Sequence, residues 1–147
     1  TVSVGWLNRI AAALDVEAAD LVTLPELADL PVVAVLGAEG TQAPRHALTV
    51  LPPRPEAGAV ALIVEAGVGD YRTGDEIWCV RLAPADYASA LNRDVVVPRP
   101  AGRFVFGRLI GREGARLQIL PLGAGAKQQV VDDPAWIAMA TRLVRRL

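Results

Sequence analysis

The sequence predicts a mainly β domain preceded by a short α-helical segment. Beyond residue 31 the apolar residues occur in short runs, which are separated by prolines and glycines. The chain contains 11 Pro and 13 Gly, a composition typical of many turns and short strands. Extended helical periodicity is confined to residues 2–22. The 147 residues are 52% hydrophobic, which suits one packed domain with a small appendage.

The helical prediction rests on apolar residues near the start of the chain. They recur at helical spacing at Trp6, Ile10, Ala13 and Leu14. Asp15 suits the N-cap of a second short helix over 18–22. The next stretch, residues 23–31, has a proline near each end and is predicted to be a linker. By pattern alone, residues 2–22 fit a generic helical hairpin equally well.

Short apolar runs predict the strands. They lie at 32–36, 47–51, 59–65, 76–82, 94–97, 103–110 and 115–120. Residues 111–114 are predicted to form a four-residue turn between the last two strands. Residues 83–91 are predicted to be helical or irregular, because Pro84 and Asp86 suit a first helical turn. The tail, 136–147, fits a helix or a strand by pattern.

Charge and composition exclude several classes of protein. A net charge of −1 and a pI near 5.8 argue against a chain that is mainly a nucleic-acid-binding surface. The single cysteine excludes an intrachain disulfide and favours a cytoplasmic setting. No apolar run reaches about 18 residues, so no membrane contact is predicted. Because the chain begins with Thr1, we expect it to be a fragment or to have lost a front end.

The rare residues limit the possible chemistry. The chain has one lysine and one histidine, and its only serines are Ser3 and Ser89. Cys79 and His46 alone cannot assemble a zinc site, so no metal or cofactor is predicted. The acidic side chains near residue 70 are Asp70, Asp75 and Glu76. They could hold calcium or magnesium, but a polar turn with capping roles is the favoured interpretation.

Residues 1–22 resemble the last part of a Cro/CI-type (XRE) helix-turn-helix domain. The matching residues are Ser3-Val4, Leu7, Ile10-Ala11, Ala13-Leu14, Val16 and Leu21-Val22. The resemblance implies that the recognition helix lies upstream, so operator DNA would be contacted through a segment outside this chain. It divides the chain into the end of a DNA-binding domain at 1–23, a linker at 24–30 and a β domain at 31–147.

The rest of the chain resembles the C-terminal domain of LexA and of phage CI-like repressors. The anchors occur in the family's order: Leu30-Pro31-Val32-Val33, Tyr71–Asp75, Arg93–Val97, Phe104–Leu109, Gln118–Pro121 and Ile137–Leu147. The resemblance implies the β fold of a self-cleaving serine peptidase. It also implies that the tail is a strand.

The same resemblance places the family's catalytic residues on residues without that chemistry. Active members use a serine nucleophile and an uncharged lysine as the general base. The serine stands nine residues before the Asp of the Gly-Asp turn, which here is Ala66. The lysine precedes Arg-Leu, and that position is Gly107. The cleavage pair would lie near Ala38 and Glu39. The chain is therefore predicted to be a pseudo-peptidase and not an enzyme.

The resemblance implies a transcriptional regulator, of repressor type, whose β domain dimerises and serves in signal sensing. The candidate interface residues are Ile119, Thr141, Arg142, Leu143 and Val144. The alternative interpretation of the tail is an edge strand that arginines protect from pairing. Implied partners are a second copy of the chain, operator DNA, and a RecA-independent inducer or an antirepressor.

Two other functions stay open on the sequence. One is a divergent self-protease with a relocated dyad, for which Ser89 and Lys127 are the available groups. The other is a ligand-sensing β module in which the loop 66–69 opens the former active-site cleft.

Overall fold

The computed structural model describes residues 30–147, and the helices predicted within 1–22 and most of the linker lie outside this range. The chain divides into two compact units, with the boundary between Arg54 and Pro55. The predicted β domain therefore does not begin at residue 31 as one body. Residues 31–54 belong to the first unit, and the large sheet is confined to 55–147.

The described part of the first unit, residues 30–54, consists of two small antiparallel strand pairs. β1 (Leu30–Val32) pairs with β4 (Leu48–Val50), and β2 (Val35–Gly37) pairs with β3 (Gly40–Gln42). The single strand predicted over 32–36 is wrong, because its two halves pair with different partners. The unit leaves large apolar side chains exposed: Leu30, Val33, Val35, Leu36, Leu48, Val50 and Leu51.

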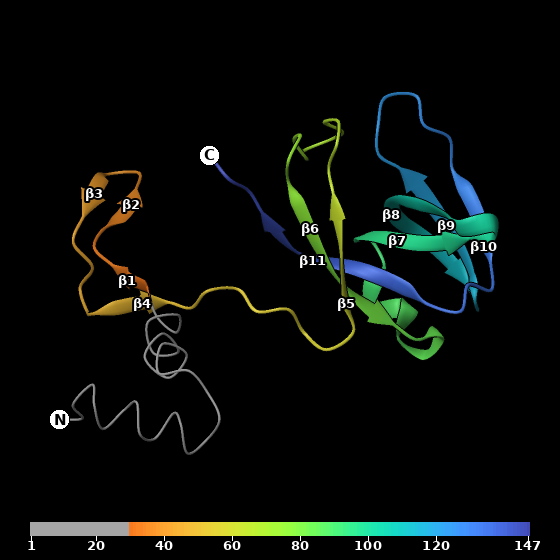
Figure 1. Cartoon of the computed structure of the whole chain (residues 1–147), viewed down its shortest axis with the longest axis horizontal. Coiled ribbons are helices and arrows are strands. Elements are labelled where there is room, and N and C mark those ends of the chain that lie inside the picture. The colour runs from red at the N-terminus through yellow and green to blue at the C-terminus, as the bar shows by residue number, and fades with distance from the viewer. Residues whose placement is uncertain (1–29) are drawn as a thin grey trace, which may run out of the picture. The chain divides into compact units, whose positions relative to one another are not determined.

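The second unit is built on one seven-stranded antiparallel sheet. Its strands are labelled in Figure 1. In chain order its strands are β5 (Ala59–Ile63), β6 (Glu76–Leu82), β7 (Asp94–Arg99), β8 (Arg103–Glu113), β9 (Arg116–Pro121), β10 (Gln129–Asp132) and β11 (Ile137–Val144). In space the order is β10-β9-β8-β7-β11-β6-β5. The closing strand therefore lies inside the sheet, between β7 and β6. The mainly β prediction is confirmed, and the tail is a strand.

The connections differ from the prediction at one turn. β8 runs on to Glu113, which pairs with Arg116, so the hairpin loop is Gly114-Ala115 and not the four residues 111–114. A bulge between Leu109 and Gly111 shifts the register and lets pairing continue. Gly114 has φ +58°, which glycine adopts without strain.

The excursion between β6 and β7 is a 3₁₀ helix, η1 (Pro84–Ala90), with Pro84 in its first turn as predicted. A second short 3₁₀ segment, η2 (Pro100–Gly102), joins β7 to β8. β3 and β10 were not predicted, because neither carries an apolar run in the sequence.

Buried side chains form two clusters in the second unit. The first contains residues of η1, β7, β8, β9 and β10: Tyr87, Ala90, Val95, Val97, Val105, Leu109, Leu117, Ile119 and Val131, together with Ile137 of β11. The second is smaller and comprises Val64, Ile77, Cys79, Val96 and Ala138. Ile119, predicted above as an interface residue, is fully buried in the first cluster. Its side chain is used in the core of the subunit and is not available to a partner.

Candidate functional site

The loop that follows β5 has a closed and locally ordered shape. Val64 N donates to the Asp75 carbonyl at 2.9 Å, and Gly74 N donates to the Val64 carbonyl at 2.7 Å, so the two ends of the loop are joined. Within the loop, Val68 and Tyr71 exchange both backbone hydrogen bonds at 3.0 Å. The glycine-rich segment is therefore a folded turn that places Ala66 and Tyr71 at defined positions.

Asp75 holds this loop to the far end of the chain. Asp75 is buried, with 1% of the residue exposed. Arg145 binds its carboxylate with two guanidinium nitrogens, Nε to Oδ1 at 2.9 Å and Nη2 to Oδ2 at 2.6 Å. Arg72 N also donates to Oδ2, at 2.8 Å. Arg145 and then the backbone N–H hold the pKa of Asp75 at about 2, although burial acts in the opposite direction. The polar turn predicted for this segment is thus stabilised by a two-point ion pair.

Ala66 is exposed in this loop and presents only a methyl group. The loop lies next to the residues that follow β9, because a Cβ at Gly69 would contact Leu122 at 3.7 Å and one at Gly123 would contact Val68 at 3.7 Å. Pro121, which precedes Leu122, is the cross-strand partner of Gly107. The structure therefore brings the loop of Ala66 to the end of the sheet where Gly107 lies.

Gly107 is buried in β8 between Val95 of β7 and Pro121 of β9. A Cβ built on it would lie 2.4 Å from the Leu120 carbonyl oxygen and 2.7 Å from Pro121 Cα. Both contacts are with backbone, so no side-chain rotation relieves them. A lysine could stand here only if β8 and β9 moved apart. Ala66 and Gly107, where the resemblance would place a nucleophile and a base, carry no side chain that could act as either.

A cluster of polar side chains that the sequence analysis did not single out lies beside this loop. Tyr71 Oη donates to Asp94 Oδ2 at 2.6 Å, and the Tyr71 ring packs edge-on against Phe106 at 5.7 Å between centroids. Arg108 is the register partner of Asp94, and its Nε lies 3.5 Å from Asp94 Oδ1. Asp94 Oδ1 is buried and accepts no hydrogen bond within the described chain. Burial and the neighbouring carboxylate raise the pKa of Tyr71, so the phenol stays a donor.

The residues considered for relocated chemistry do not form a catalytic pair within 30–147. Ser89 Oγ donates to the Asp86 carbonyl at 2.7 Å on η1, and Lys127 is exposed in the loop after β9. Cys79 is buried, and burial raises its thiol pKa to about 11, so the reactive thiolate is not formed near neutrality. Among these described residues, no three His, Cys, Asp or Glu side chains are grouped as a metal site requires.

Ala38 and Glu39 form the two-residue turn of the β2–β3 hairpin. They lie between the paired residues Gly37 and Gly40, and Gly40 has φ +108°. Both are exposed, at the rim of a hollow of about 400 Å³ that the same hairpin and the following residues line. A cleavage pair would need such exposure.

The remaining interface candidates lie where β11 has a strand on one side only. β6 accompanies β11 to Val144, whereas β7 pairs with Ala138 and Met139 alone. Arg93 Nη2 donates to the Ala140 carbonyl, and beyond it no described strand pairs with this edge at Thr141–Val144. Leu143 is 44% exposed. The end of β11 therefore offers an open edge with an apolar side chain.

Comparisons with known proteins do not assign the chain. No protein-family model, no curated protein and no solved structure matches it. In the described part of the chain, none of the helices has the length and apolar character needed to cross a membrane.

Gly107→Ala tests the close approach of β8 and β9. We expect it to lower the free energy of unfolding by about 1–3 kcal/mol, because the new methyl group meets backbone that cannot rotate away. Urea denaturation of the full chain measures this. The control is Gly67→Ala, whose Cβ would meet only the Tyr71 carbonyl at an ordinary 3.4 Å. Equal stability of the two variants would contradict the packing described here.

The Asp75–Arg145 pair predicts a specific loss of stability in acid. The folded pKa of about 2 lies below the ordinary value of 3.8, so the stabilisation is complete above pH 4 and is lost as the pH falls toward 2. The difference in Tm between the native chain and Asp75→Asn should therefore be largest near pH 6 and shrink toward pH 2. Asp132→Asn, in an exposed pair with Arg116, is the control and should show no such trend.

Proposed function

We propose that the chain is part of a DNA-binding transcriptional regulator whose peptidase-like β domain holds two copies together and does not cut. The resemblance of residues 1–22 to the end of a helix-turn-helix domain supports the DNA-binding part. The mainly β second unit and its closing strand agree with the fold that the resemblance to LexA and CI-like repressors implies.

The observation that carries the proposal is the packing at Gly107. An active relative needs a lysine side chain at this position, and here the β9 backbone occupies the space of even a Cβ. Ala66 lacks the hydroxyl at the partner position. A chain that keeps such a fold without its chemistry retains assembly as the role that the fold can serve.

The open edge at Thr141–Val144 supports dimerisation through β11. In a two-fold pairing the same edge of each copy would meet, so one free strand is sufficient on each side. No described strand pairs with the backbone groups along this edge, and a second copy would pair with them. Dimerisation would place two DNA-reading heads on adjacent half-sites and raise the effective concentration of the second.

The full chain should stay intact under conditions that promote self-cleavage. Raising the pH to about 10 increases the neutral fraction of a lysine base, yet Lys127 is exposed and has no serine partner in the described chain. We expect one mass by mass spectrometry after prolonged incubation. Ala66→Ser should also stay intact, since it restores the nucleophile without the base. A fragment that ends near Ala38 would refute the proposal, and its loss in Ser89→Ala or Lys127→Ala would identify a relocated dyad.

Leu143→Arg tests dimerisation. The substitution adds a positive charge to an edge that already carries Arg142, so two copies meeting there would repel each other. Sedimentation equilibrium should show a dimer of the 15.5 kDa chain, and the variant should associate at least about tenfold more weakly. Leu120→Arg is the matched control, because Leu120 is 39% exposed on β9, and it should leave association unchanged. A monomeric native chain, or equal effects of both variants, would argue against the β11 interface.

A further inference from the structure

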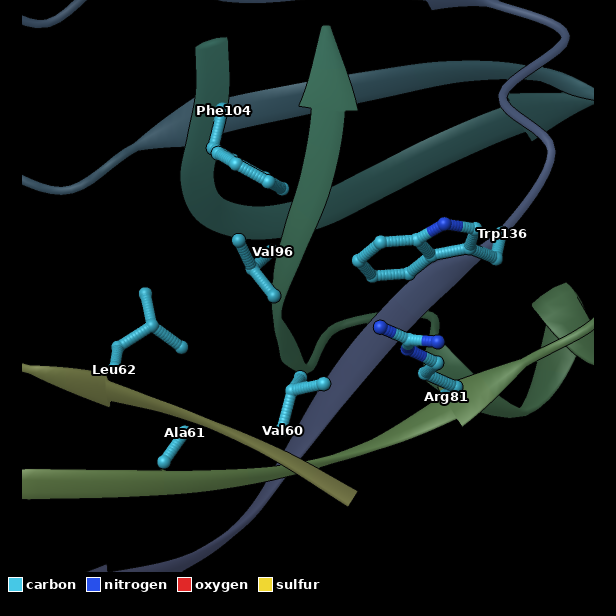
Figure 2. A pocket seen from close by; sticks show the side chains of 7 residues that line it. All are labelled: Val60, Ala61, Leu62, Arg81, Val96, Phe104 and Trp136. Atoms are coloured by element: carbon cyan, nitrogen blue, oxygen red, sulfur yellow. The ribbon is translucent and has the colours of Figure 1, made fainter. Parts of the chain in front are cut away.

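An apolar cleft in the second unit contains a single cationic side chain. Its volume is about 280 Å³, and its lining residues are Val60, Ala61, Leu62, Arg81, Val96, Phe104 and Trp136. Figure 2 shows these side chains around an open space, with the Arg81 guanidinium facing the Trp136 ring. The walls come from strands on both sides of β11, and no acidic residue lines them.

The aromatic wall of the cleft consists of the exposed Phe104 and the half-buried Trp136. Phe104 is 59% exposed, and its ring lies 6.4 Å from that of Trp136, between centroids, at an angle of 50°. The opposite wall comes from β5, where Val60 and Leu62 are half-buried. Two aromatic faces that remain in water can gain contact area when a flat apolar group covers them.

Arg81 is exposed, stacks on Trp136 and keeps its hydrogen-bonding capacity. Its guanidinium carbon lies 4.5 Å from the centroid of the Trp136 ring, which fixes one face of the planar group. Within residues 30–147 it makes no ion pair and no side-chain hydrogen bond. A stacked guanidinium still presents N–H donors along its edge, in the spacing that a carboxylate accepts with both oxygens.

We propose that this cleft binds a small planar carboxylate whose apolar body lies against Phe104 and Trp136 while its carboxylate pairs with Arg81. One positive charge on apolar walls matches a monoanion better than a polyphosphate, which needs several cations. The volume lies just below the roughly 300–1,000 Å³ typical of sites for drug-sized ligands, so the ligand is a compact one. The proposal rests on residues 60–136 alone and is independent of the proposed regulatory function.

The pair 2-naphthoate and 2-naphthamide tests the charge preference, because the two probes differ only in the group that would meet Arg81. The full chain is labelled with ¹⁵N, and the indole N–H signal of Trp136 is assigned by its loss in Trp136→Phe. We expect 2-naphthoate to shift this signal saturably and to bind at least tenfold more tightly than the amide. No shift of the Trp136 signal at millimolar acid, or equal affinity for acid and amide, would overturn the proposal.

Variants at the cleft separate its two contributions. Arg81→Met should abolish the preference for the acid, whereas Arg81→Lys should keep part of it, since lysine retains the charge but not the planar fork. Phe104→Ala should weaken both probes similarly. Arg112→Met is the matched control, because Arg112 is an exposed arginine at the distant β8–β9 hairpin, and it should change neither affinity. An unchanged acid preference in Arg81→Met would overturn the assignment of the cation.

Discussion

The carboxylate of Asp75 joins the start of β6, the loop that precedes it and the segment that follows β11. It is buried, it accepts from the backbone of its own loop through Arg72, and both of its oxygens are bound by Arg145, seventy positions further along the chain. Removing one partner of a buried charged pair leaves the other without compensation, so these groups stabilise the fold only together. Arg145 also donates to the Asp70 carbonyl at 3.0 Å. The shape of the glycine-rich loop and the position of the end of β11 are therefore set by the same interaction.

β8 and β9 approach each other closely at Gly107, near the residues after β9 that this loop contacts. Because the strands meet through backbone at this point, the end of the sheet has no space for a charged side chain. The Tyr71 ring packs edge-on against Phe106, and its hydroxyl donates to Asp94, so these contacts hold the loop against β7 and β8. Backbone contact and one aromatic side chain thus organise a region where the resemblance would place a serine and a lysine. If the resemblance holds, a serine at position 66 would have no base at position 107 beside it.

The sequence was sufficient for the features that depend on local pattern. Apolar runs located most strands of the sheet, and Pro84 marked the start of η1. Periodicity could not decide the tail, because Met139 and Leu143 satisfy both periods, and the family resemblance decided it correctly. The sequence does not show which strands pair with each other. Strand pairing divides residues 32–36 between β1 and β2, and it extends β8 past its bulge. Pairing also makes β10 a strand although it contains polar residues. For the same reason, the burial of Ile119 and the cleft with Arg81 and Trp136 required the three-dimensional structure.

β11 connects the two surfaces for which we propose binding. Trp136 immediately precedes it, and Arg81 is the cross-strand partner of Ala138 near its start, whereas the open edge occupies its end. The first part is paired on both sides at Ala138 and Met139, and Arg145, the residue just after the strand, is fixed by its ion pair with Asp75. Coupling between two sites requires an element with two arrangements that both sites bias. Within β11, the bulge between Ala140 and Arg142 is the irregularity that separates the doubly paired part from the free edge.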